Sequence, residues 1–468
     1  MALEATTGLG VVAEATGGRV VAGAAAARVT GVAIDSRGVE PGQLFVAIAG
    51  PRFDGHDFVA EAAARGAAAA LVHRDVSAPA GLGLVRVADT TAGLADLARR
   101  ARSLAEVPVV CVTGSAGKTT TKDMTAALLQ TRGPVLNTEG NLNNRYGLPL
   151  MLLRLRPEHT AAVLELGMSA AGELRGLSKI ARPDVAVITL VAPVHLEFFA
   201  SVDEIAVAKA EILEGLAEGG VAVLNGDDPR VKRIGEAHLA RGGRVVWFGR
   251  DRAHDVSAEN WRGTVHGMRF LLRIGDRTED VALPLPGPHF LANFLAAAAV
   301  AHHLGVGIEA IAGTAATLKA ASHRGEVLSL GQGITLLDDC YNSNPTAVEA
   351  AVTALGLAAR GRRVAFLGDM LELGPSGPAL HRETGEKVGG RLDLLTAVGP
   401  LAEGFLEGAR RAGLPPSALV AFPDSAAAAA AAPDLVRSGD AVLVKGSRGV
   451  RMESIVEALR TRFGAVEA

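Results

Sequence analysis

Short apolar runs alternate with amphipathic segments through the middle of the chain. The runs are rich in β-branched residues, and the segments between them carry apolar residues at helical spacing. This alternation predicts a parallel β-sheet that helices cover on both faces. The expected strands are Val107–Thr113, Ala161–Leu166, Val185–Leu190 and Val221–Leu224, and the expected helices are Thr119–Gln130 and Ser201–Leu216.

Two further blocks with strand and helix patterns flank this middle block. In the first block we expect a helix near His56–Arg65 and strands at Val29–Ile34, Leu44–Ala49, Ala69–Val72 and Leu84–Val87. In the last block we expect strands at Gly333–Asp338, Arg363–Gly368, Leu394–Val398 and Ala441–Val444. A cap-like Asp89-Thr90-Thr91 opens the middle block. We therefore expect three α/β domains, at residues 1–88, 89–321 and 322–468.

Composition narrows the classes of protein. A length of 468 residues agrees with about three domains. The net charge of −3 provides no strong field for nucleic acid or an anionic membrane. No apolar stretch approaches the ~20 residues of a membrane span, and the N-terminus lacks a signal-peptide pattern. Cys111 and Cys340 lie in or beside apolar runs, so we interpret them as packing residues in a reducing compartment, not as a disulfide or a zinc site.

The most informative motif is VVCVTGSAGKTTT at Val109–Thr121, which has the order strand, glycine-containing turn, helix. Gly114 and Gly117 allow backbone N–H groups to curve around phosphate oxygens. Lys118 supplies a positive charge, and the Thr119 hydroxyl can ligate Mg²⁺. Val112 replaces the first glycine of the longer standard motif. The flanking strand and helix favour a phosphate-binding loop over a chance Gly-rich turn.

Glu165 and His195 follow other strands of the same expected sheet. A carboxylate at the end of an apolar strand is costly to bury unless it is paired or bound to metal. The simpler alternatives are an ordinary salt bridge for Glu165 and an ordinary loop histidine for His195. Ligands of such sheets bind beyond the carboxyl ends of the strands, so the shared placement with the phosphate loop favours a metal site.

Lys209 has two equally open interpretations. Ser201 and Glu204 have the spacing of a capping box that starts a helix. The apolar stripe of that helix consists of Ile205, Ala208, Ile212 and Leu216. Lys209 lies inside the stripe, where it could extend its amine to solvent. It could instead be a desolvated, neutral amine that is available as a nucleophile.

Polar groups also end strands in the other blocks. Asp338-Asp339 closes an apolar strand, and Asn344-Pro345 has the order of an N-cap and first helical residue. Asn342 and Ser343 could line a ligand site or only support that cap. Lys445–Arg448 suits an anionic group but could be a solvated basic turn. The residues alone thus predict a magnesium-dependent nucleoside triphosphate enzyme, and a kinase, a GTPase switch and an ATP-dependent ligase all stay open.

Longer motifs along nearly the whole chain resemble the Mur ligase family. In the middle block TGSAGKTTTK, NTEGNLNNRYGLP, LELGMSAAGEL and ITLVAPVHLEFFAS resemble its ATP loop, Asn-rich substrate loop, metal-carboxylate strand and histidine segment. DSRGVEPGQLFVAIAG and DGHDF are similar to its uridine-nucleotide-binding domain. DDCYNSNPTA, LGDMLELG and LVKGSRGVRME resemble the dipeptide-adding members. LPGPHFLAN resembles the adenine-binding helix start, although Phe290 replaces the usual first asparagine and only Asn293 is retained.

The resemblance implies a fold and an activity. The fold is a central P-loop parallel-sheet ATPase domain, flanked by a small α/β N-terminal domain and a Rossmann-like C-terminal domain. The N-terminal domain would bind the UDP-substrate, and the C-terminal domain would bind a dipeptide. The implied enzyme is an ATP-dependent ligase that adds D-alanyl-D-alanine to UDP-N-acetylmuramoyl-tripeptide through an acyl phosphate. Its product would be the pentapeptide precursor of peptidoglycan, on which cell shape and division depend.

The resemblance also implies residue roles. Thr119 and Glu165 would hold one Mg²⁺, and His195 with a carbamylated Lys209 would lie near a second. Arg324 would reach the transferring phosphate, and Asp339 would hold the ribose. The implied catalytic residues are Lys118, Lys209, His195 and Arg324. The implied ATP-binding residues are Gly114, Ser115, Ala116, Gly117, Lys118, Thr119, Thr120, Asn293, Arg324 and Asp339. The implied substrate-binding residues are Ser36, Arg37, Asn141, Asn143, Asn144, Tyr341, Asn342, Asn344, Lys445, Ser447 and Arg448.

The expected partners are the two small-molecule substrates, with ATP and two Mg²⁺ ions as cofactors. We expect a cytoplasmic monomer that binds no nucleic acid and has no membrane span. The third residue of the acceptor peptide, meso-diaminopimelate or lysine, stays open. A nucleotide switch that uses the same loop without ligation is the alternative from another functional class.

Overall fold

The computed structural model describes residues 7–77, 79–264 and 266–466. The chain groups into two compact units. The first unit extends to Thr113 and also includes Leu129–Val187 and Ala210–Ala222. The second unit includes Gly114–Leu128, Ile188–Lys209 and the chain from Val223 onward. No helix in the described ranges is long and apolar enough to cross a membrane.

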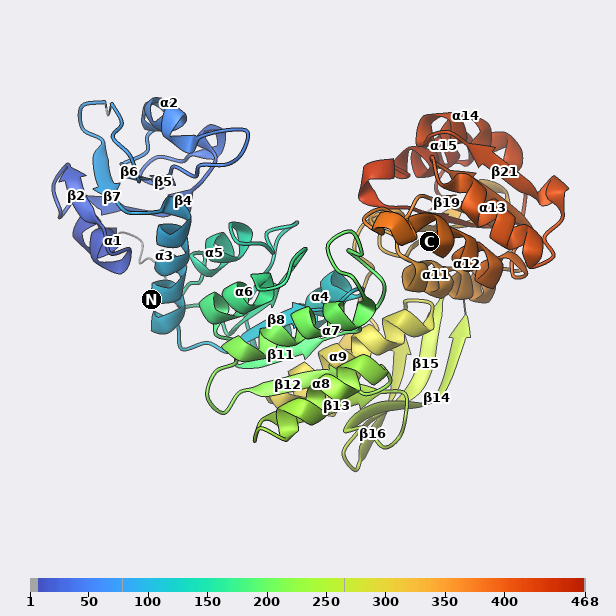
Figure 1. Cartoon of the computed structure of the whole chain (residues 1–468). Helices are drawn as coiled ribbons and strands as arrows, with labels where there is room; N and C mark the ends of the chain where they lie inside the picture. Colours follow the sequence, from blue (N-terminus) through green and yellow to red (C-terminus); the bar gives the residue numbers. More distant parts are fainter. Residues whose placement is uncertain (1–6, 78, 265, 467–468) are drawn as a thin grey trace. The chain divides into compact units, whose positions relative to one another are not determined.

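The N-terminal part of the first unit contains two small sheets. A five-stranded sheet has the order β2 (Arg19–Ala22), β7 (Gly83–Arg86), β6 (Ala69–Val72), β5 (Leu44–Val46) and β4 (Val32–Ala33). A two-stranded sheet pairs β1 (Thr7–Gly8) with β3 (Arg28–Val29). Figure 1 shows these strands in blue with α1 (Leu9–Ala15) and α2 (Val59–Ala64).

The single strand expected at Val29–Ile34 is wrong. Val29 pairs with β1, whereas Val32 and Ala33 pair with β5. Between them the Thr30 N–H donates to the carbonyl of Gly42 at 2.9 Å. The backbone therefore leaves one sheet and enters another, and the apolar run covers both.

The largest sheet has nine strands in the order β16-β15-β14-β13-β12-β11-β8-β10-β9. Its strands are β8 (Val109–Thr113), β9 (Val135–Asn137), β10 (Ala161–Glu165), β11 (Val185–Ile188), β12 (Val221–Asn225), β13 (Arg244–Gly249), β14 (Val256–Thr264), β15 (Gly267–Ile274) and β16 (Arg277–Leu283). Strand β10 pairs in parallel with β8, as expected, and also with β9, which was not among the expected strands. Strands β14 to β16 pair antiparallel, because only two residues separate consecutive strands, which is too few for a helical crossover. The sheet is therefore mixed.

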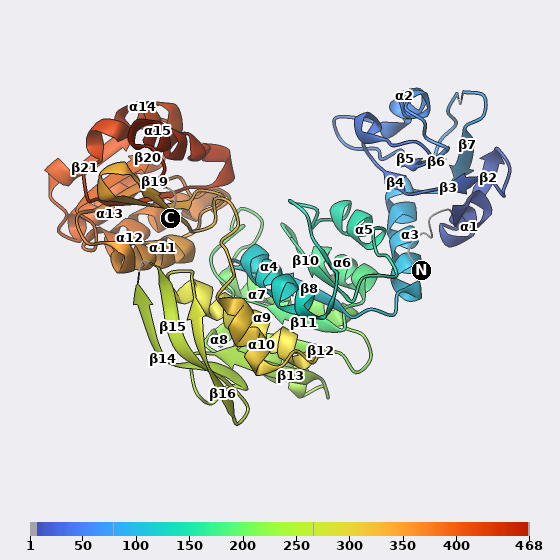
Figure 2. The ribbon, with the colours of Figure 1, turned by 180° about the vertical axis from the view of Figure 1, so that it is seen from behind.

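Helices cover both faces of this sheet around β13. Figure 1 shows α7 (Val202–Ala210) and α8 (Pro229–Leu239) in front of the strands. Figure 2, from behind, shows α4 (Lys118–Leu129), α9 (Pro288–His303) and α10 (Ile308–Ala315). The first unit adds α3 (Thr90–Leu104), α5 (Gly147–Leu152) and α6 (Glu173–Ala181). The Asp89 carboxylate accepts the Thr91 and Ala92 N–H groups, which confirms the expected cap of α3.

The helix expected at Ser201–Leu216 is shorter than predicted. The hydroxyl of Ser201 accepts the Glu204 N–H at 3.2 Å, which confirms the N-terminal cap. The α-helix ends at Ala210, and Glu211–Gly215 forms a 3₁₀ helix. A Cβ at Gly215 would lie 2.2 Å from the Ser178 carbonyl carbon in α6. This close packing, together with hydrogen bonds from the Gly172 and Arg175 N–H groups to the Glu211 carboxylate, accounts for the tighter turn.

The C-terminal part of the second unit contains a six-stranded sheet. The order is β17 (Glu326–Leu330), β18 (Ile334–Asp339), β22 (Ala441–Lys445), β19 (Arg363–Gly368), β20 (Leu394–Val398) and β21 (Leu419–Phe422). Within this six-stranded sheet, the edge strand β17 is antiparallel to its neighbour β18 and the other described pairs are parallel. The helices are α11 (Pro345–Ala358), α12 (Gly377–Gly389), α13 (Ala402–Arg411), α14 (Ser425–Leu435) and α15 (Glu453–Phe463).

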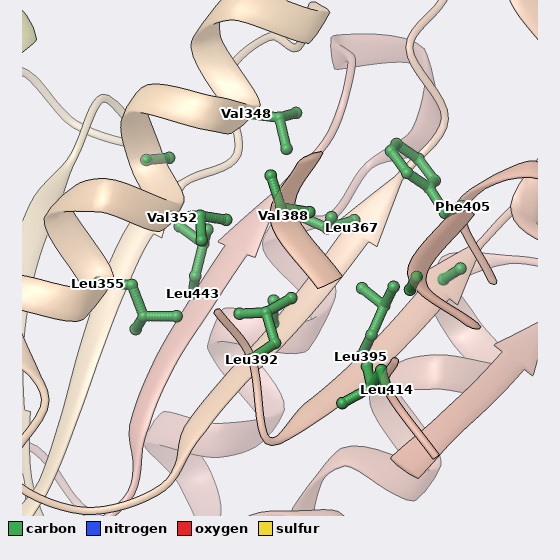
Figure 3. Packing of buried hydrophobic residues seen from close by; sticks show 14 of the residues in the cluster. Val348, Val352, Leu355, Leu367, Val388, Leu392, Leu395, Phe405, Leu414 and Leu443 are labelled. Carbon is green, nitrogen blue, oxygen red and sulfur yellow. The ribbon is translucent and has the colours of Figure 1, made fainter. Parts of the chain in front are cut away.

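Side chains of this sheet alternate between two apolar cores. Ala365 and Leu367 of β19 belong to the core beneath α11, α12 and α13. Val364 and Phe366 belong to the core beneath α14 and α15. Figure 3 shows Val348, Val352 and Leu355 of α11 directed toward Leu443 and Leu367 of the sheet. Because strands present successive side chains to opposite faces, a continuous apolar run marks a strand that is buried on both sides.

Candidate active site

The phosphate loop expected from the sequence lies between β8 and α4. Gly114 has φ +151° and Gly117 has φ +80°. A Cβ at Gly114 would lie 1.8 Å from Oγ1 of Thr189, and one at Gly117 would lie 2.3 Å from Oδ1 of Asn293. Only glycine fits these two positions without displacing its neighbours. Lys118 opens α4, and its Nζ donates to the Gly114 carbonyl at 3.0 Å, so the loop curves around its own lysine.

The segment that follows β11 anchors this loop. The Ser115 N–H donates to the Leu190 carbonyl at 2.8 Å, and its hydroxyl donates to the Ala192 carbonyl at 3.1 Å. Thr189 donates its hydroxyl to the Ala116 carbonyl at 2.6 Å. Thr189 was not among the expected site residues. Its position two residues before the VAPVH segment gives no sequence signal of this contact.

Asn293 lies against the phosphate loop, as a residue of a nucleotide site should. It is 6% exposed in α9, and its Oδ1 accepts the hydroxyl of Thr121 at 3.3 Å. The nearby His289 ring has a buried Nδ1 without a hydrogen-bond partner. Desolvation therefore lowers the pKa of His289 to about 4, against a smaller opposing effect of Asp339.

The Glu165 carboxylate ends β10 and is 5% exposed. In the sheet its Cα is opposite Val112, two positions before Gly114 in the chain. Oε1 accepts the side-chain amide of Asn143 at 2.8 Å, and the Glu165 N–H donates to the Thr138 hydroxyl at 2.9 Å. The structure thus brings together the expected metal carboxylate and one asparagine of the expected substrate loop.

The other two expected substrate-binding asparagines, Asn141 and Asn144, are exposed. Asn141 accepts the Asn143 N–H on its backbone carbonyl at 2.8 Å. The Asn144 Oδ1 accepts the N–H groups of Tyr146 and Gly147, both at 3.0 Å, and so caps the start of α5. Asn144 therefore fixes the loop geometry around Asn143.

His195 contacts a residue that the sequence analysis did not select. Its Nδ1 lies 2.6 Å from Oε2 of Glu372, which belongs to the LELG motif after β19. The Glu197 N–H also donates to the Glu372 carbonyl at 3.3 Å. Both His195 (φ +54°) and Glu372 (φ +63°) have left-handed backbone conformations, which are uncommon away from glycine and concentrate at functional sites. The His195 ring lowers the pKa of Glu372 mainly through this side-chain contact, and the Lys118 charge adds to the effect.

Lys209 is among the largest fully buried side chains, at 1% exposure in the last turn of α7. Ile205, Ala208 and Ile212 of its stripe are also buried. This exposure excludes the solvent-extended interpretation, and the nucleophile interpretation stays a prediction.

Two arginines flank an aromatic ring beside β18. The guanidinium carbon of Arg324 lies 3.9 Å from the centre of the Tyr341 ring, and that of Arg448 lies 5.7 Å from it. Cation–π contacts of this kind hold guanidinium groups in place without neutralising them. The structure thus groups three expected site residues, although Arg448 is also paired with Glu453 at 3.3 Å.

A second group lies at the carboxyl ends of β18 and β22. Nζ of Lys445, 2% exposed, lies 2.6 Å from Oδ2 of Asp339 and donates to the Asn342 carbonyl at 3.0 Å. The Asn344 Oδ1 accepts the Ala347 N–H at 2.9 Å, which confirms the cap of α11. The Ser447 hydroxyl accepts the Leu371 N–H at 2.9 Å, next to Glu372. These contacts position the expected dipeptide residues and the LELG segment together.

The expected uridine-binding pair follows β4. The Ser36 hydroxyl is buried and donates to Glu61 at 3.2 Å. The Arg37 guanidinium is exposed beside Asp35, and its hydrogen bonds lower the pKa of Asp35 to about 2. Arg37 is therefore exposed but paired with Asp35 through two side-chain hydrogen bonds.

Comparisons with known proteins agree with this geometry. The chain matches the Mur ligase middle domain over residues 112–301, the Mur ligase glutamate ligase domain over 323–448 and the Mur ligase family catalytic domain over 28–102. It is 40% identical to the UDP-N-acetylmuramoyl-tripeptide–D-alanyl-D-alanine ligase of Escherichia coli, over 92% of this chain and 93% of that protein. The identity to the Bacillus subtilis ligase of the same name is 36%, over 92% and 93%.

Solved structures give the same result. A crystal structure of MurF from Acinetobacter baumannii superposes with a TM-score of 0.89 at 34% identity, covering 97% of this chain and 99% of that one. MurF from Thermotoga maritima in complex with ADP gives a TM-score of 0.81 at 32% identity, covering 92% and 97%. The chain therefore belongs to the Mur ligase family, within the group of the MurF ligases.

Proposed function

We propose that this chain is an ATP-dependent amide ligase that joins D-alanyl-D-alanine to UDP-N-acetylmuramoyl-tripeptide. The observation that carries the proposal is the phosphate loop, which Thr189 and Ser115 fasten to the segment bearing His195. That arrangement occurs in a chain 40% identical to a ligase of this name. The product would be the pentapeptide precursor of peptidoglycan. We assign the UDP-substrate to residues 1–88, ATP to 89–321 and the dipeptide to 322–468.

ATP would bind with its phosphates against Gly114–Thr120. The N–H groups at the start of α4 and the Lys118 ammonium provide positive potential for the β- and γ-phosphates. The Asn293 side chain lies next to Gly117, and we assign Asn293 to the part of the site that binds adenosine. Asp339 would accept a hydrogen bond from the ribose, and Arg324 would approach the transferring phosphate.

The acceptor carboxylate would attack the γ-phosphorus in line, releasing ADP and forming an acyl phosphate. The dipeptide amine would then attack the acyl carbon and expel inorganic phosphate. Lys118 and Arg324 stabilise the negative charge that develops on the phosphoryl oxygens. The acyl phosphate must be kept from water, which would otherwise hydrolyse it.

The residues present fit two Mg²⁺ ions. For the first ion, the proposed donors are the Thr119 hydroxyl and the Glu165 carboxylate. For the second ion, they are the His195 ring and a carbamylated Lys209. Oxygen ligands of this kind suit Mg²⁺. Glu165 is buried at a strand end with Asn143 on one oxygen, and Glu372 contacts Nδ1 of His195 rather than Nε2. When bound, the ions would neutralise phosphate charge. Lys209, 1% exposed at the end of α7, is the residue that we propose to be carbamylated.

We infer a cytoplasmic monomer. Both cysteines are free and buried, which suits a reducing compartment. ATP and the nucleotide-linked acceptor are cytoplasmic metabolites, so the reaction belongs there.

An assay of ADP release tests the proposal against a nucleotide switch. Turnover should require the UDP-linked tripeptide and D-alanyl-D-alanine together, and the acceptor should gain the mass of one dipeptide. Parallel acceptors with meso-diaminopimelate or lysine at the third position identify the native substrate. ATP turnover that is independent of both substrates would favour the switch.

A further inference from the structure

Three potential metal ligands converge at the start of the C-terminal sheet, outside the proposed Mg²⁺ sites. His323 precedes β17, Asp338 lies in β18 and Cys340 follows β18. Their donor atoms all lie within 4.8 Å of one another. Nδ1 of His323 is 2.8 Å from Oδ2 of Asp338 and 3.5 Å from Sγ of Cys340. Sγ is 3.0 Å from Oδ1 of Asp338, to which the thiol donates.

These separations suit a tetrahedral ion. Zinc bonds of ~2.3 Å to sulfur and ~2.0 Å to nitrogen place the two ligand atoms about 3.5 Å apart at a tetrahedral angle. The observed separation between Sγ and Nδ1 is 3.5 Å. The contacts of Asp338 are shorter because they are hydrogen bonds, one to each carboxylate oxygen, and each would need to open by about 0.5 Å for its oxygen to become a ligand.

Backbone contacts hold the three groups together. The Tyr341 N–H donates to the His323 carbonyl at 3.0 Å, and the Gly325 N–H donates to the Asp338 carbonyl at 2.8 Å. Asp338 is 2% exposed and Cys340 is fully buried, whereas 35% of the His323 side chain is exposed. The cluster therefore has a fixed buried side and one solvent-facing ligand through which an ion can enter.

We propose that His323, Asp338 and Cys340 form a site for one thiophilic divalent cation, with Zn²⁺ as the best fit. The fourth position would be open to water on the solvent side of His323. Binding forms one metal–thiolate bond and releases the thiol proton to solvent, and the ring proton that Nδ1 donates to Asp338 must move to Nε2 by exchange with solvent before Nδ1 can bind the ion. Sulfur ligation favours zinc over Mg²⁺ at this site. The site therefore does not compete for the Mg²⁺ ions that the proposed ligase reaction uses.

Metal titration of the full chain tests the site without nucleotide or substrate. Co²⁺ or Cd²⁺, added alone, should produce thiolate-to-metal charge-transfer absorption that saturates at one ion per chain. Cys340→Ser should abolish that absorption, and Cys111→Ala should retain it. Cys111 is the matched control because it is the only other cysteine and lies buried in β8. Ions at His195 or Glu165 have no thiolate and give no such band.

A second variant keeps the test decisive if Cys340→Ser does not fold. His323→Asn changes a partly exposed side chain and should weaken Zn²⁺ binding about tenfold or more by calorimetry. Zn²⁺ should also raise the melting temperature of the wild-type chain more than that of His323→Asn. Absent charge-transfer absorption in the wild-type chain, or a band that survives Cys340→Ser, would overturn the proposal.

Discussion

The imidazole Nδ1 of His195 lies 2.6 Å from the carboxylate Oε2 of Glu372, and the two residues follow strands of different sheets. A metal-binding histidine commonly donates its second ring N–H to a carboxylate, which fixes the tautomer and the ring orientation. In the proposed metal site, a hydrogen bond from Nδ1 to Glu372 would leave the lone pair of Nε2 for an ion. We therefore propose that Glu372 is a positioning residue for His195.

Replacing Glu372 by Gln should weaken the binding of Mg²⁺ at the proposed site that contains His195. The charge that orients His195 is lost, and we expect the Mg²⁺ concentration for half-maximal activity to rise about 10–100-fold. Mn²⁺ binding measured by electron paramagnetic resonance should weaken in parallel. Glu386→Gln, an exposed change on α12, is the control and should match the wild-type chain. Unchanged Mn²⁺ binding in Glu372→Gln would remove this role.

Gly117→Ala should damage nucleotide binding. Its φ of +80° strains an L-residue, and the new Cβ would lie 2.3 Å from Oδ1 of Asn293. Displacing the loop by about 1 Å should lower kcat/KM about 100-fold. Calorimetry with ADP measures the binding loss directly. Gly313→Ala in α10 meets no atom within 4 Å and should bind ADP normally.

Lys209→Ala tests the carbamate. We expect activity to fall about 100-fold, and short carboxylates such as acetate or formate should restore part of it by occupying the vacated position. Lys232→Ala, an exposed change on α8, should show neither effect. Normal activity of Lys209→Ala would contradict a carbamate at this position.

His289 should make stability depend on pH. The pKa of His289 in the folded state, about 4, lies below the ordinary value of 6.5, so the unfolded chain binds this proton more readily. The contribution of His289 to folding stability is therefore fully present above pH 6.5 and is lost as the pH falls toward 4. From pH 7.5 to 5 the free energy of unfolding should decrease by up to about 2 kcal/mol more in the wild-type chain than in His289→Gln. Denaturant titrations at the two pH values give this difference. Parallel pH profiles for both proteins would show that His289 does not carry the effect.

Strands buried on both faces were predictable from the sequence. Arg363–Gly368 and Leu394–Val398 have the expected bounds, because a continuous apolar run is the signature of a strand between two cores. The missed edge strands β17 and β21 are mostly only partly buried. β14 leaves its apolar pattern after Ala258 and becomes exposed, so its sequence has no continuous run either.

Some parts of the candidate site were also predictable from the sequence, and others were not. The phosphate loop is local in sequence, so glycine spacing and Lys118 were enough to predict it. The contacts between His195 and Glu372, and between Thr189 and Ala116, join residues from different parts of the chain. Neither partner carries a local pattern that selects the other, so only the fold reveals these pairs.

The most direct measurement follows oxygen atoms through one turnover. The UDP-linked tripeptide is labelled with ¹⁸O in its terminal carboxylate and mixed with ATP, Mg²⁺ and D-alanyl-D-alanine. Transfer through an acyl phosphate predicts one ¹⁸O in each released phosphate and a product heavier by one dipeptide residue. Dipeptide addition with unlabelled phosphate, or phosphate release with no peptide product, would contradict the proposed ligase.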